Sequence, residues 1–418
     1  MRHALSSESD HQPSGRPLRV LHVITRLIVG GAQENTLLTA IGQHRLGMKV
    51  TLLAGPDPGP EGDLHEAAWK GGVALHILPR LVRPIRPLND LIALFQLYRV
   101  MKRGGYDVVH THSSKAGILG RIAARMAGVE TVVHTLHGLA FHPYQARWKN
   151  ALYIRLKRIA APLSDFIIAV SQKTIDGALA AGIGTPHQYV KIFSGMELDP
   201  FLEAGSRITV SEARRRLSIP DKAPVVGKIA RLFPLKGHDA FLQAAARIAA
   251  EEPECRFLLV GDGILRRELE EEARRLSIGD RTIFAGLVPP EEVGPFIQAM
   301  DVVVHTSLRE GIARVIPQAG AVGKPVVTYE LDGAPEVVRE GFSGFLVSPG
   351  DVEGIARRTL ELLRDPSLRA EMGARGRAFA AEHYPAARMV DAINAVYARA
   401  RARKAEVSLS WLDRSSYG

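Results

Sequence analysis

The stretch that decides the fold is residues 301–330, DVVVHTSLREGIARVIPQAGAVGKPVVTYE. Two apolar runs, DVVVHTS and KPVVTYE, flank a segment of helix length. Pro317 suits the first turn of that helix, where its missing N–H leaves no hydrogen bond unmade. Short apolar runs that alternate with helices are typical of parallel sheets with helices on both faces. The stretch therefore predicts a strand, a loop, a helix and a second strand.

The same alternation recurs along the chain. The apolar runs of the first half are LRVLHVIT, MKVTLLAG, VALHILP, DVVHTH, ETVVHTLHG, DFIIAVS and VKIFSG, and the second half has PVVGKIARL, CRFLLVGDG, RTIFAGLV, DVVVHTS, KPVVTYE and GFLVSPG. Two such sets in series predict an α/β protein with two doubly wound, Rossmann-like parallel-sheet domains. Ligands of open α/β sheets bind beyond the carboxyl ends of the strands, so we expect a site in a central cleft between the domains.

The domain boundary is expected near MELDPFLEAGSR, before the helical SEARRRLSIP. The predicted organisation is a polar N-terminal tail over residues 1–16, a first domain over 17–203 and a second domain over 204–382. YPAARMVDAINAVYARARARK predicts a long helix, assigned to 383–405, and residues 406–418 are expected to form a weakly structured tail.

Composition narrows the class of protein. The 418 residues are 46% hydrophobic and 23% charged, which is ordinary for a soluble chain and long enough for two domains. The polar N-terminus predicts no secretory signal, and no apolar run reaches the ~20 residues of a membrane-spanning helix. Cys255 is the single cysteine, so no internal disulfide is possible and a cytoplasmic location is expected. The net charge of +10 suits phosphorylated ligands or anionic lipid, whereas no nucleic-acid-binding signature accompanies it.

Two glycine clusters follow predicted strands. Gly30 and Gly31 precede the helix-like AQENTLLTAIGQ, where backbone amides and a helix N-terminus can approach an anion. A tight turn without a ligand explains this pair equally well. VGDG supplies Gly261 and Gly263, but Arg266 replaces the third glycine of the dinucleotide fingerprint, so NAD binding is not expected. Close approach to another ligand stays open there.

Two cations follow the first strand of the second domain. In ARLFPLKG, Arg231 and Lys236 stand in a turn at the predicted carboxyl end of that strand. Such a pair can converge on a diphosphate, with Arg as a fork and Lys as a point charge. The alternative is a pair of solvated surface charges, and the position at the predicted cleft favours the diphosphate.

The loop of the opening stretch is the richest in polar chemistry. Glu310 is expected to project into the cleft, and Gln318 to lie in the first helical turn. Ile312 and Ala313 can direct backbone amides at a phosphate, with help from the helix dipole. The alternative makes Glu310 an ordinary helix-entry carboxylate.

Histidines gather at His110, His112, His134, His137 and His142. They lack the spacing of a zinc site and have no nearby carboxylate ligand, so no metal site is predicted. His137 precedes Gly138 at a strand terminus, where a side chain can reach the cleft as a hydrogen-bond partner or proton carrier. His110, His112 and His134 alternate within predicted strands and are interpreted as sheet or strand-end residues.

A basic stretch with apolar residues at helical spacing, KNALYIRLKRIAAPLSD, follows the histidine-rich region, and LPRLVRPIRPL adds more arginine. A solvated helix face explains both stretches. The alternative is reversible peripheral contact with an anionic membrane surface.

Taken together these motifs resemble the retaining, nucleotide-sugar-dependent glycosyltransferases of family 4 (glycosyl transferases group 1), of the bacterial polysaccharide type. The resemblance covers roughly residues 18–400 and rests on GGAQEN, DVVHTHSSKAGILGRIAARMAG, HTLHGLAFH, ARLFPLKG, VGDG, the EGI…Q stretch and GAPEVVREGFSGFLVSPGD. It implies the GT-B fold, with the last helix crossing back to the first domain. It also implies transfer of a sugar, expected from a UDP-sugar, to a hydroxyl of a lipid-linked or glycan acceptor.

The resemblance also implies roles for individual residues. His137 and Glu310 are the implied catalytic residues, close to the transferred sugar. The implied donor-binding residues are Gly30, Gly31, Arg231, Lys236, Gly261, Gly311, Ile312, Ala313 and Gln318. No D-x-D triplet occurs in the chain, so neither a metal nor another cofactor is expected, and protein cations would stabilise the leaving diphosphate.

Gln318 departs from the family pattern, which places a second glutamate there to hold the ribose hydroxyls. Glutamine keeps an acceptor oxygen and loses a charge, which costs on the order of 1 kcal/mol of donor binding. Two alternatives to the transferase are a metal-free nucleotide-sugar epimerase and a non-catalytic sugar-nucleotide-binding protein. An epimerase needs no acceptor, so analysis of the products separates it from a transferase.

Overall fold

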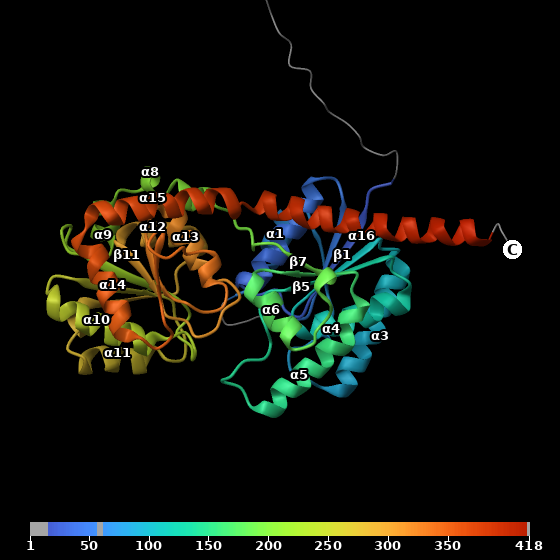
Figure 1. Ribbon diagram of the computed structural model, residues 1–418, viewed down its shortest axis with the longest axis horizontal. Coiled ribbons are helices and arrows are strands. Elements are labelled where there is room, and N and C mark those ends of the chain that lie inside the picture. The colour runs from blue at the N-terminus through green and yellow to red at the C-terminus, as the bar shows by residue number, and fades with distance from the viewer. Residues whose placement is uncertain (1–15, 57–61, 416–418) are drawn as a thin grey trace, which may run out of the picture.

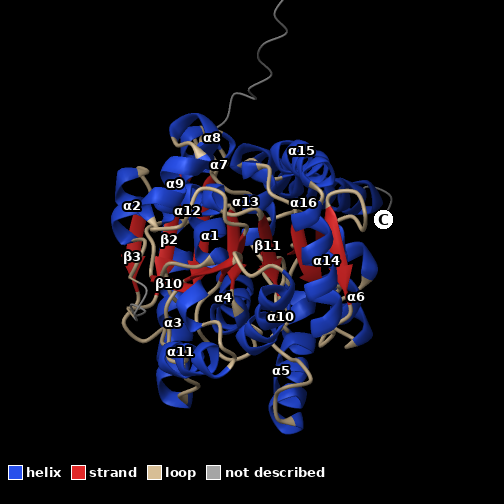
Figure 2. Cartoon of the chain, turned by 90° about the vertical axis from the view of Figure 1, so that its left-hand side faces the viewer, coloured by secondary structure: helices blue, strands red, loops and turns tan. Residues whose placement is uncertain are grey.

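The computed structural model describes residues 16–56 and 62–415, and two parallel sheets organise them (Figure 1). The first sheet has strand order β3-β2-β1-β4-β5-β6-β7, and the second has order β10-β9-β8-β11-β12-β13. In each sheet the chain turns back beside the first strand of its domain, as in doubly wound folds. Helices cover both faces of the sheets (Figure 2). The predicted α/β fold of GT-B type, with two Rossmann-like domains, is confirmed.

The strands of the first sheet are β1 (Arg19–Ile24), β2 (Lys49–Ala54), β3 (Ala74–Ile77), β4 (Val108–His112), β5 (Thr131–Leu136), β6 (Phe166–Ala169) and β7 (Tyr189–Lys191). Those of the second are β8 (Val225–Ile229), β9 (Arg256–Val260), β10 (Thr282–Gly286), β11 (Val302–His305), β12 (Val326–Tyr329) and β13 (Gly344–Val347).

The helices up to the second sheet are α1 (Gly31–Arg45), α2 (His65–Lys70), α3 (Pro87–Gly104), α4 (Ser114–Ala127), α5 (Arg147–Ala160), α6 (Gln172–Ala180), α7 (Asp199–Leu202), α8 (Ala204–Arg207) and α9 (Val210–Arg216). The later helices are α10 (His238–Glu251), α11 (Arg266–Arg275), α12 (Val293–Ala299), α13 (Val315–Val322), α14 (Val352–Arg364), α15 (Pro366–His383) and α16 (Ala386–Ser415).

The apolar runs form strands because both faces of each sheet are buried. Successive residues of a strand point to opposite faces. In β1, Val20 and Ile24 belong to one hydrophobic core of the first domain, and Leu21 and Val23 belong to the other. The second domain repeats this division across its own sheet. Nearly continuous apolar runs are therefore what such strands require.

The boundary between the domains lies earlier than predicted. Met196, Leu198 and Phe201 were assigned to the first domain, but they pack in a core of the second with Val225 of β8. These apolar side chains fit the open face of the second sheet, so the segment belongs to the domain that it buries. The first domain thus ends shortly after β7.

The long C-terminal helix α16 runs across the first domain (Figure 1). The chain crosses between domains beside Met196, whose N–H donates to the carbonyl of Tyr384 at 2.9 Å. Beyond this point Met389, Ile393 and Tyr397 pack into a core of the first domain.

Helix α16 continues to Ser415, past the predicted end at residue 405. The tail prediction for residues 406–415 is therefore wrong. That segment holds no proline or glycine to stop a helix. The rest of the predicted C-terminal tail (416–418), and residues 1–15 of the predicted N-terminal tail, lie outside the described residues.

Candidate active site

A cavity of about 620 Å³ lies between the two domains. The predicted residues that line it are Gly31, Arg231, Lys236, Glu310, Ile312, Ala313 and Gln318. They come from the start of α1, the loop after β8, the loop between β11 and α13, and the first turn of α13. Because the carboxyl ends of parallel strands meet at one edge of a sheet, residues far apart in the chain converge there. The cavity is the candidate active site.

Glu310 is held in place by three groups around it. Lys236 contacts its carboxylate through Nζ, and the Ser307 hydroxyl donates to the same oxygen at 3.1 Å. The backbone N–H of Glu310 donates to a carboxylate oxygen of Asp332 at 2.6 Å. Burial raises the pKa of Asp332 above its ordinary value. The acid and the cation predicted separately from the sequence therefore form one ion pair at the cavity wall.

Gly311 brings the two domains into contact. A Cβ at this position would lie 2.2 Å from the carbonyl oxygen of His137, in the first domain, and 3.1 Å from Val170. Only a residue without a side chain lets the two backbones approach so closely. His137 itself lies behind this contact and does not line the cavity as the structure describes it.

Gly30 and Gly261, also predicted to bind the donor, do not line the cavity formed by the described residues. Gly261 has φ +134, and a Cβ there would meet the carbonyl oxygen of Ala230 at 2.1 Å. Gly263 is likewise confined by the carbonyl of Leu232 at 2.4 Å. Both glycines allow the chain after β9 to pass over the chain after β8, which explains their presence without a ligand.

Helix α13 begins at Val315, so Pro317 is in its first turn, as predicted. The backbone N–H of Gln318 donates to the carbonyl of Arg314 at 3.1 Å. Gln318 therefore lines the cavity from a helix start, whereas Glu310 stands in the preceding loop.

Arg314 is a cavity residue that the sequence reasoning missed. Its guanidinium forms an ion pair with Glu34 of α1, in the other domain, at 2.9 Å between Nη2 and Oε2. Its Cδ would lie 3.1 Å from a Cβ placed on Gly31. Its Nη1 is buried and makes no hydrogen bond within the described chain. The sequence did offer a signal for Arg314, because it is a cation in the same predicted loop as Glu310.

His305 was missed as well, although it ends β11 and so satisfies the strand-end rule that selected Arg231. It lines the cavity while 5% exposed, and neither ring nitrogen has a partner among the described residues. Burial holds its pKa well below the ordinary value. Nearby, the buried Lys228 donates to the Thr306 hydroxyl at 2.9 Å, and burial lowers its pKa to about 7. A neutral imidazole and a buried amine thus lie behind the cations of the cavity.

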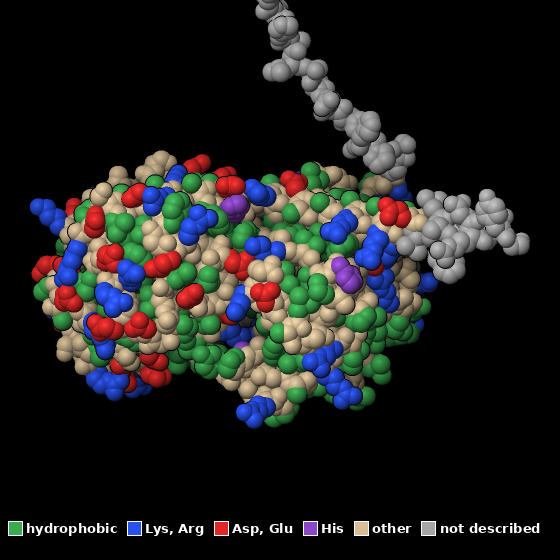
Figure 3. Space-filling model, in the orientation of Figure 1, with side chains coloured by type: hydrophobic (Ala, Val, Ile, Leu, Met, Phe, Trp, Pro, Cys, Tyr) green, Lys and Arg blue, Asp and Glu red, His purple; other side chains and the backbone are tan. Residues whose placement is uncertain are grey.

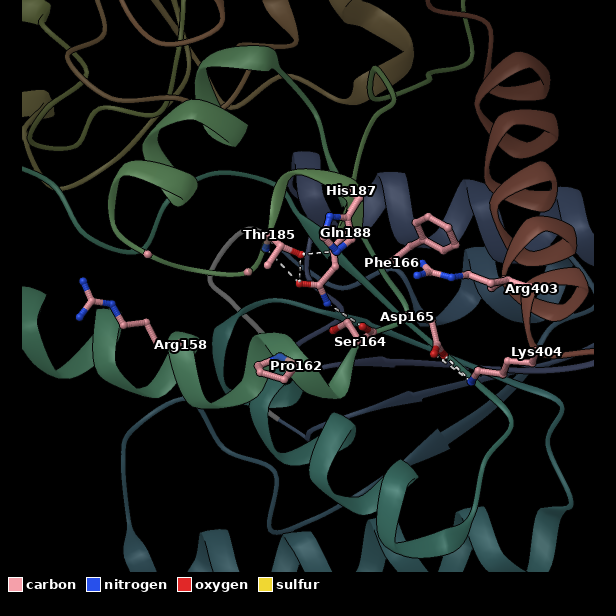
Figure 4. A pocket seen from close by; sticks show the side chains of 13 residues that line it. Arg158, Pro162, Ser164, Asp165, Phe166, Thr185, His187, Gln188, Arg403 and Lys404 are labelled. Atoms are coloured by element: carbon pink, nitrogen blue, oxygen red, sulfur yellow. Dashed lines mark hydrogen bonds and ion pairs between the residues drawn. The ribbon is translucent and has the colours of Figure 1, made fainter. Parts of the chain in front are cut away.

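A larger cavity, of about 730 Å³, lies at the outer edge of the first domain beside α16 (Figure 4). Two of its cations are engaged locally: Lys404 forms an ion pair with Asp165 at 2.8 Å, and Arg158 donates to the Ala181 carbonyl at 2.7 Å. None of the predicted site residues lines it. The smaller interdomain cavity is therefore the better candidate for chemistry.

Comparison with known proteins identifies the relatives of this chain. The glycosyl transferases group 1 family matches residues 209–379, and glycosyltransferase family 4 matches residues 29–188. The chain is 31% identical to the Escherichia coli UDP-Gal:alpha-D-GlcNAc-diphosphoundecaprenol alpha-1,3-galactosyltransferase over 299 residues, which is 71% of this chain and 76% of that enzyme. It is 28% identical to the 2-deoxystreptamine glucosyltransferase of Streptomyces kanamyceticus, over 73% of this chain and 82% of that one.

Among solved structures, Anabaena HepE in complex with UDP superposes with a TM-score of 0.77 at 24% identity, covering 91% of this chain and 100% of that one. At this identity the likeness shows the fold. Together with the sequence matches to both domains, it leads to one conclusion. The chain belongs to the glycosyltransferases of family 4 (glycosyl transferases group 1) and is a GT-B enzyme.

Proposed function

We propose that the enzyme transfers a sugar from a UDP-sugar to a hydroxyl of a lipid-linked glycan precursor, with retention at the anomeric carbon. The observation that carries this is the convergence of Arg231, Lys236 and Glu310 on one interdomain cavity. The UDP donor and the lipid-linked acceptor are supported by the names of the galactosyltransferase and of the UDP complex described above.

The cavity supplies the charge that a departing diphosphate needs. Arg231 and Lys236 would stabilise negative charge on the leaving nucleotide, and the ion pair with Arg314 places a third cation beside Gly31. Glu310 would bond the hydroxyls of the transferred sugar, with His137 behind it. This mechanism assigns no step to a metal, because the protein's own cations take that role.

UDP is expected to stabilise the folded enzyme more than GDP or ADP in a thermal-shift assay. A ligand that binds only the folded state contributes about 2.7 kcal/mol at a concentration of one hundred times its Kd. Equal nucleotide concentrations make the three shifts comparable. A shift with GDP or ADP and none with UDP would contradict the assigned donor.

Gln318→Glu is expected to keep the enzyme active and to change the donor KM by on the order of fivefold, with kcat nearly unchanged. The substitution alters one charged hydrogen bond to the ribose, worth about 1 kcal/mol, and no group at the reacting centre. Initial rates across donor concentrations measure both constants. An inactive wild type that the substitution revives would instead show that position 318 decides whether the enzyme turns over.

A lipid-linked acceptor requires access to a membrane surface. Among the described residues no helix is both long and apolar enough to span a bilayer. Instead, exposed apolar side chains gather on α3, α5 and the turn before α3, and we call them the α3–α5 surface: Ile85, Leu88, Leu91, Ile92, Phe95, Trp148, Leu152 and Ile159. Leu88 is 79% exposed and Trp148 is 66% exposed.

Exposed cations lie on the same segments of the chain: Arg83, Arg86, Arg147, Lys149 and Arg155. Basic and hydrophobic side chains both reach the lower edge of the first domain (Figure 3). Apolar side chains flanked by cations bind the headgroup region of anionic membranes. The two basic stretches identified in the sequence supply this surface, which supports peripheral attachment to the cytoplasmic face of a membrane.

The double variant Leu88→Ser with Leu91→Ser is expected to bind vesicles containing phosphatidylglycerol on the order of tenfold more weakly than wild type, because two exposed apolar side chains no longer insert. Co-sedimentation measures the bound fraction. Ile264→Ser is the matched control, since Ile264 is 74% exposed on the second domain. Equal binding of both variants, or equal binding to neutral vesicles, would contradict membrane docking through the α3–α5 surface.

A further inference from the structure

A chain of buried polar side chains leads from α1 to His137. Gln43 of α1 bonds His22 of β1, with 2.8 Å between Oε1 and Nε2. His22 Nδ1 lies 3.0 Å from His112 Nε2, and His112 Nδ1 lies 3.2 Å from His137 Nε2. His22 and His112 are fully buried. The four side chains therefore form a continuous line of hydrogen bonds that ends at His137, behind the interdomain cavity.

The amide of Gln43, at the end of the line away from His137, sets the direction of the hydrogen bonds. Gln43 Nε2 donates to Asn394 Oδ1 of α16 at 2.9 Å, so its Oε1 is the atom that faces His22. A carbonyl oxygen only accepts, so His22 carries its proton on Nε2. The bare Nδ1 of His22 then accepts from His112, and the bare Nδ1 of His112 accepts from His137.

This assignment requires each imidazole to hold one proton. Burial lowers the pKa of His22 to about 4 and that of His137 to about 4. Burial also holds the pKa of His112 well below its ordinary value. All three rings are therefore neutral near pH 7, and each hydrogen bond from Gln43 to His137 contains one ring N–H.

We propose that Gln43, His22 and His112 are positioning residues that hold His137 as the Nε2–H tautomer, with Nδ1 left as a hydrogen-bond acceptor. His137 Nδ1 is buried and has no partner among the described residues. An unmade hydrogen bond at a buried atom costs free energy, which a hydroxyl of a bound sugar would offset by donating to Nδ1. The sugar as partner rests on the proposed function. In this tautomer His137 accepts at Nδ1 and has no proton to donate there.

A metal site is the competing interpretation of the same residues. Ligand atoms of His22, His110 and His112 lie within 4.8 Å of one another. His110, however, bonds the Tyr397 hydroxyl at 2.6 Å and the Thr135 hydroxyl at 2.7 Å. Both ring nitrogens of all three histidines thus already have hydrogen-bond partners, and an ion would have to break several of these bonds. The geometry favours the hydrogen-bonded chain.

The crossing helix α16 acquires a role in this arrangement. Asn394 orients the amide of Gln43, and Tyr397 bonds the neighbouring His110. Both residues lie on the part of α16 that packs against the first domain. The helix that ties the domains together therefore also sets the start of the histidine chain.

Nuclear magnetic resonance of the full chain labelled with ¹⁵N-histidine tests the tautomer directly. Long-range ¹H–¹⁵N correlations distinguish a protonated from a bare ring nitrogen, and the His137→Gln spectrum identifies the signals of His137. We expect an Nε2–H tautomer for His137 in the wild type without ligand. A predominant Nδ1–H tautomer, or a protonated ring at pH 7, would overturn the proposal whatever the variants do.

Two variants test the cause. Gln43→Met removes the oxygen that accepts from His22. Asn394→Leu removes the side chain that orients the Gln43 amide, and Asn394 is less buried than Gln43. Either is expected to give His137 a mixture of tautomers, and kcat on the order of fivefold lower, because only part of the population is competent. His134→Gln is the matched control. It removes a buried imidazole of β5 that bonds Thr111 and is not part of the line from Gln43 to His137. The His137 signals should therefore stay unchanged.

If both Gln43→Met and Asn394→Leu leave the His137 tautomer unchanged, the hydrogen-bonded side chains do not determine it, and the proposal is overturned. The tautomer is read without turnover, so this outcome differs from failure of the proposed function. If the wild type shows the expected tautomer but UDP-sugars are not used, the donor assignment alone is wrong.

Discussion

Lys236→Ala is expected to lower kcat by about 10²- to 10³-fold, the usual effect of removing one charged donor from a site where negative charge develops. Two effects act together here. The leaving diphosphate loses a cation, and Glu310, which Lys236 contacts, keeps only the Ser307 hydroxyl as a side-chain partner among the described residues. An uncompensated carboxylate beside the phosphates repels the charge that the transition state builds up. Initial rates at saturating donor measure the effect.

The control for this variant is Lys222→Ala, which removes an exposed lysine of the same domain. It should leave kcat within about twofold of wild type, because exposed charges contribute little. Melting temperatures of the two variants should agree closely, since the Lys236–Glu310 pair is partly exposed. A Lys236→Ala enzyme that keeps more than a third of the wild-type kcat would exclude Lys236 from stabilising the leaving group.

Gly311→Ala is expected to reduce kcat/KM by about 10²-fold, because a displacement near 1 Å at a catalytic constellation has that effect. The added methyl group would stand 2.2 Å from the His137 carbonyl oxygen, a distance that backbone atoms can relieve only by separating the two domains. Glu310, the preceding residue, would move with the loop. The steady-state rate with limiting donor measures the loss.

Gly205→Ala is the matched control for the added methyl group. Its new Cβ would have its nearest neighbour at 3.6 Å, an ordinary contact, and the residue lies in helix α8 of the same domain. Alanine favours a helix over glycine, so activity and stability should be retained. If Gly311→Ala is as active as Gly205→Ala, the domains do not need the close approach at His137 during catalysis.

The sequence was sufficient for the fold and for the chemical character of the site. Apolar runs alternating with helices predicted both sheets, because a strand buried on two faces needs apolar side chains on both. The strand-end rule then placed Arg231, Lys236 and Glu310 at one cleft, since the carboxyl ends of parallel strands share an edge whatever the details of packing. The alternation of apolar runs with helices and the direction of the strands are local properties, so they can be predicted from the sequence.

The tertiary structure decided which residues touch across the domains. The Arg314–Glu34 pair joins residues far apart in sequence, and Gly311 is required by a carbonyl in another domain. Gly261, predicted to bind the donor, has to be a glycine because of the backbone of Ala230, whether or not a ligand is bound. The histidines of β4 were interpreted only as sheet or strand-end residues and His22 of β1 was not singled out, because their hydrogen-bond order depends on Gln43 and Asn394 from two distant helices. Side-chain pattern determines where a strand or helix forms, but the partners of a polar atom are set by whatever the packed chain brings within 3 Å of it.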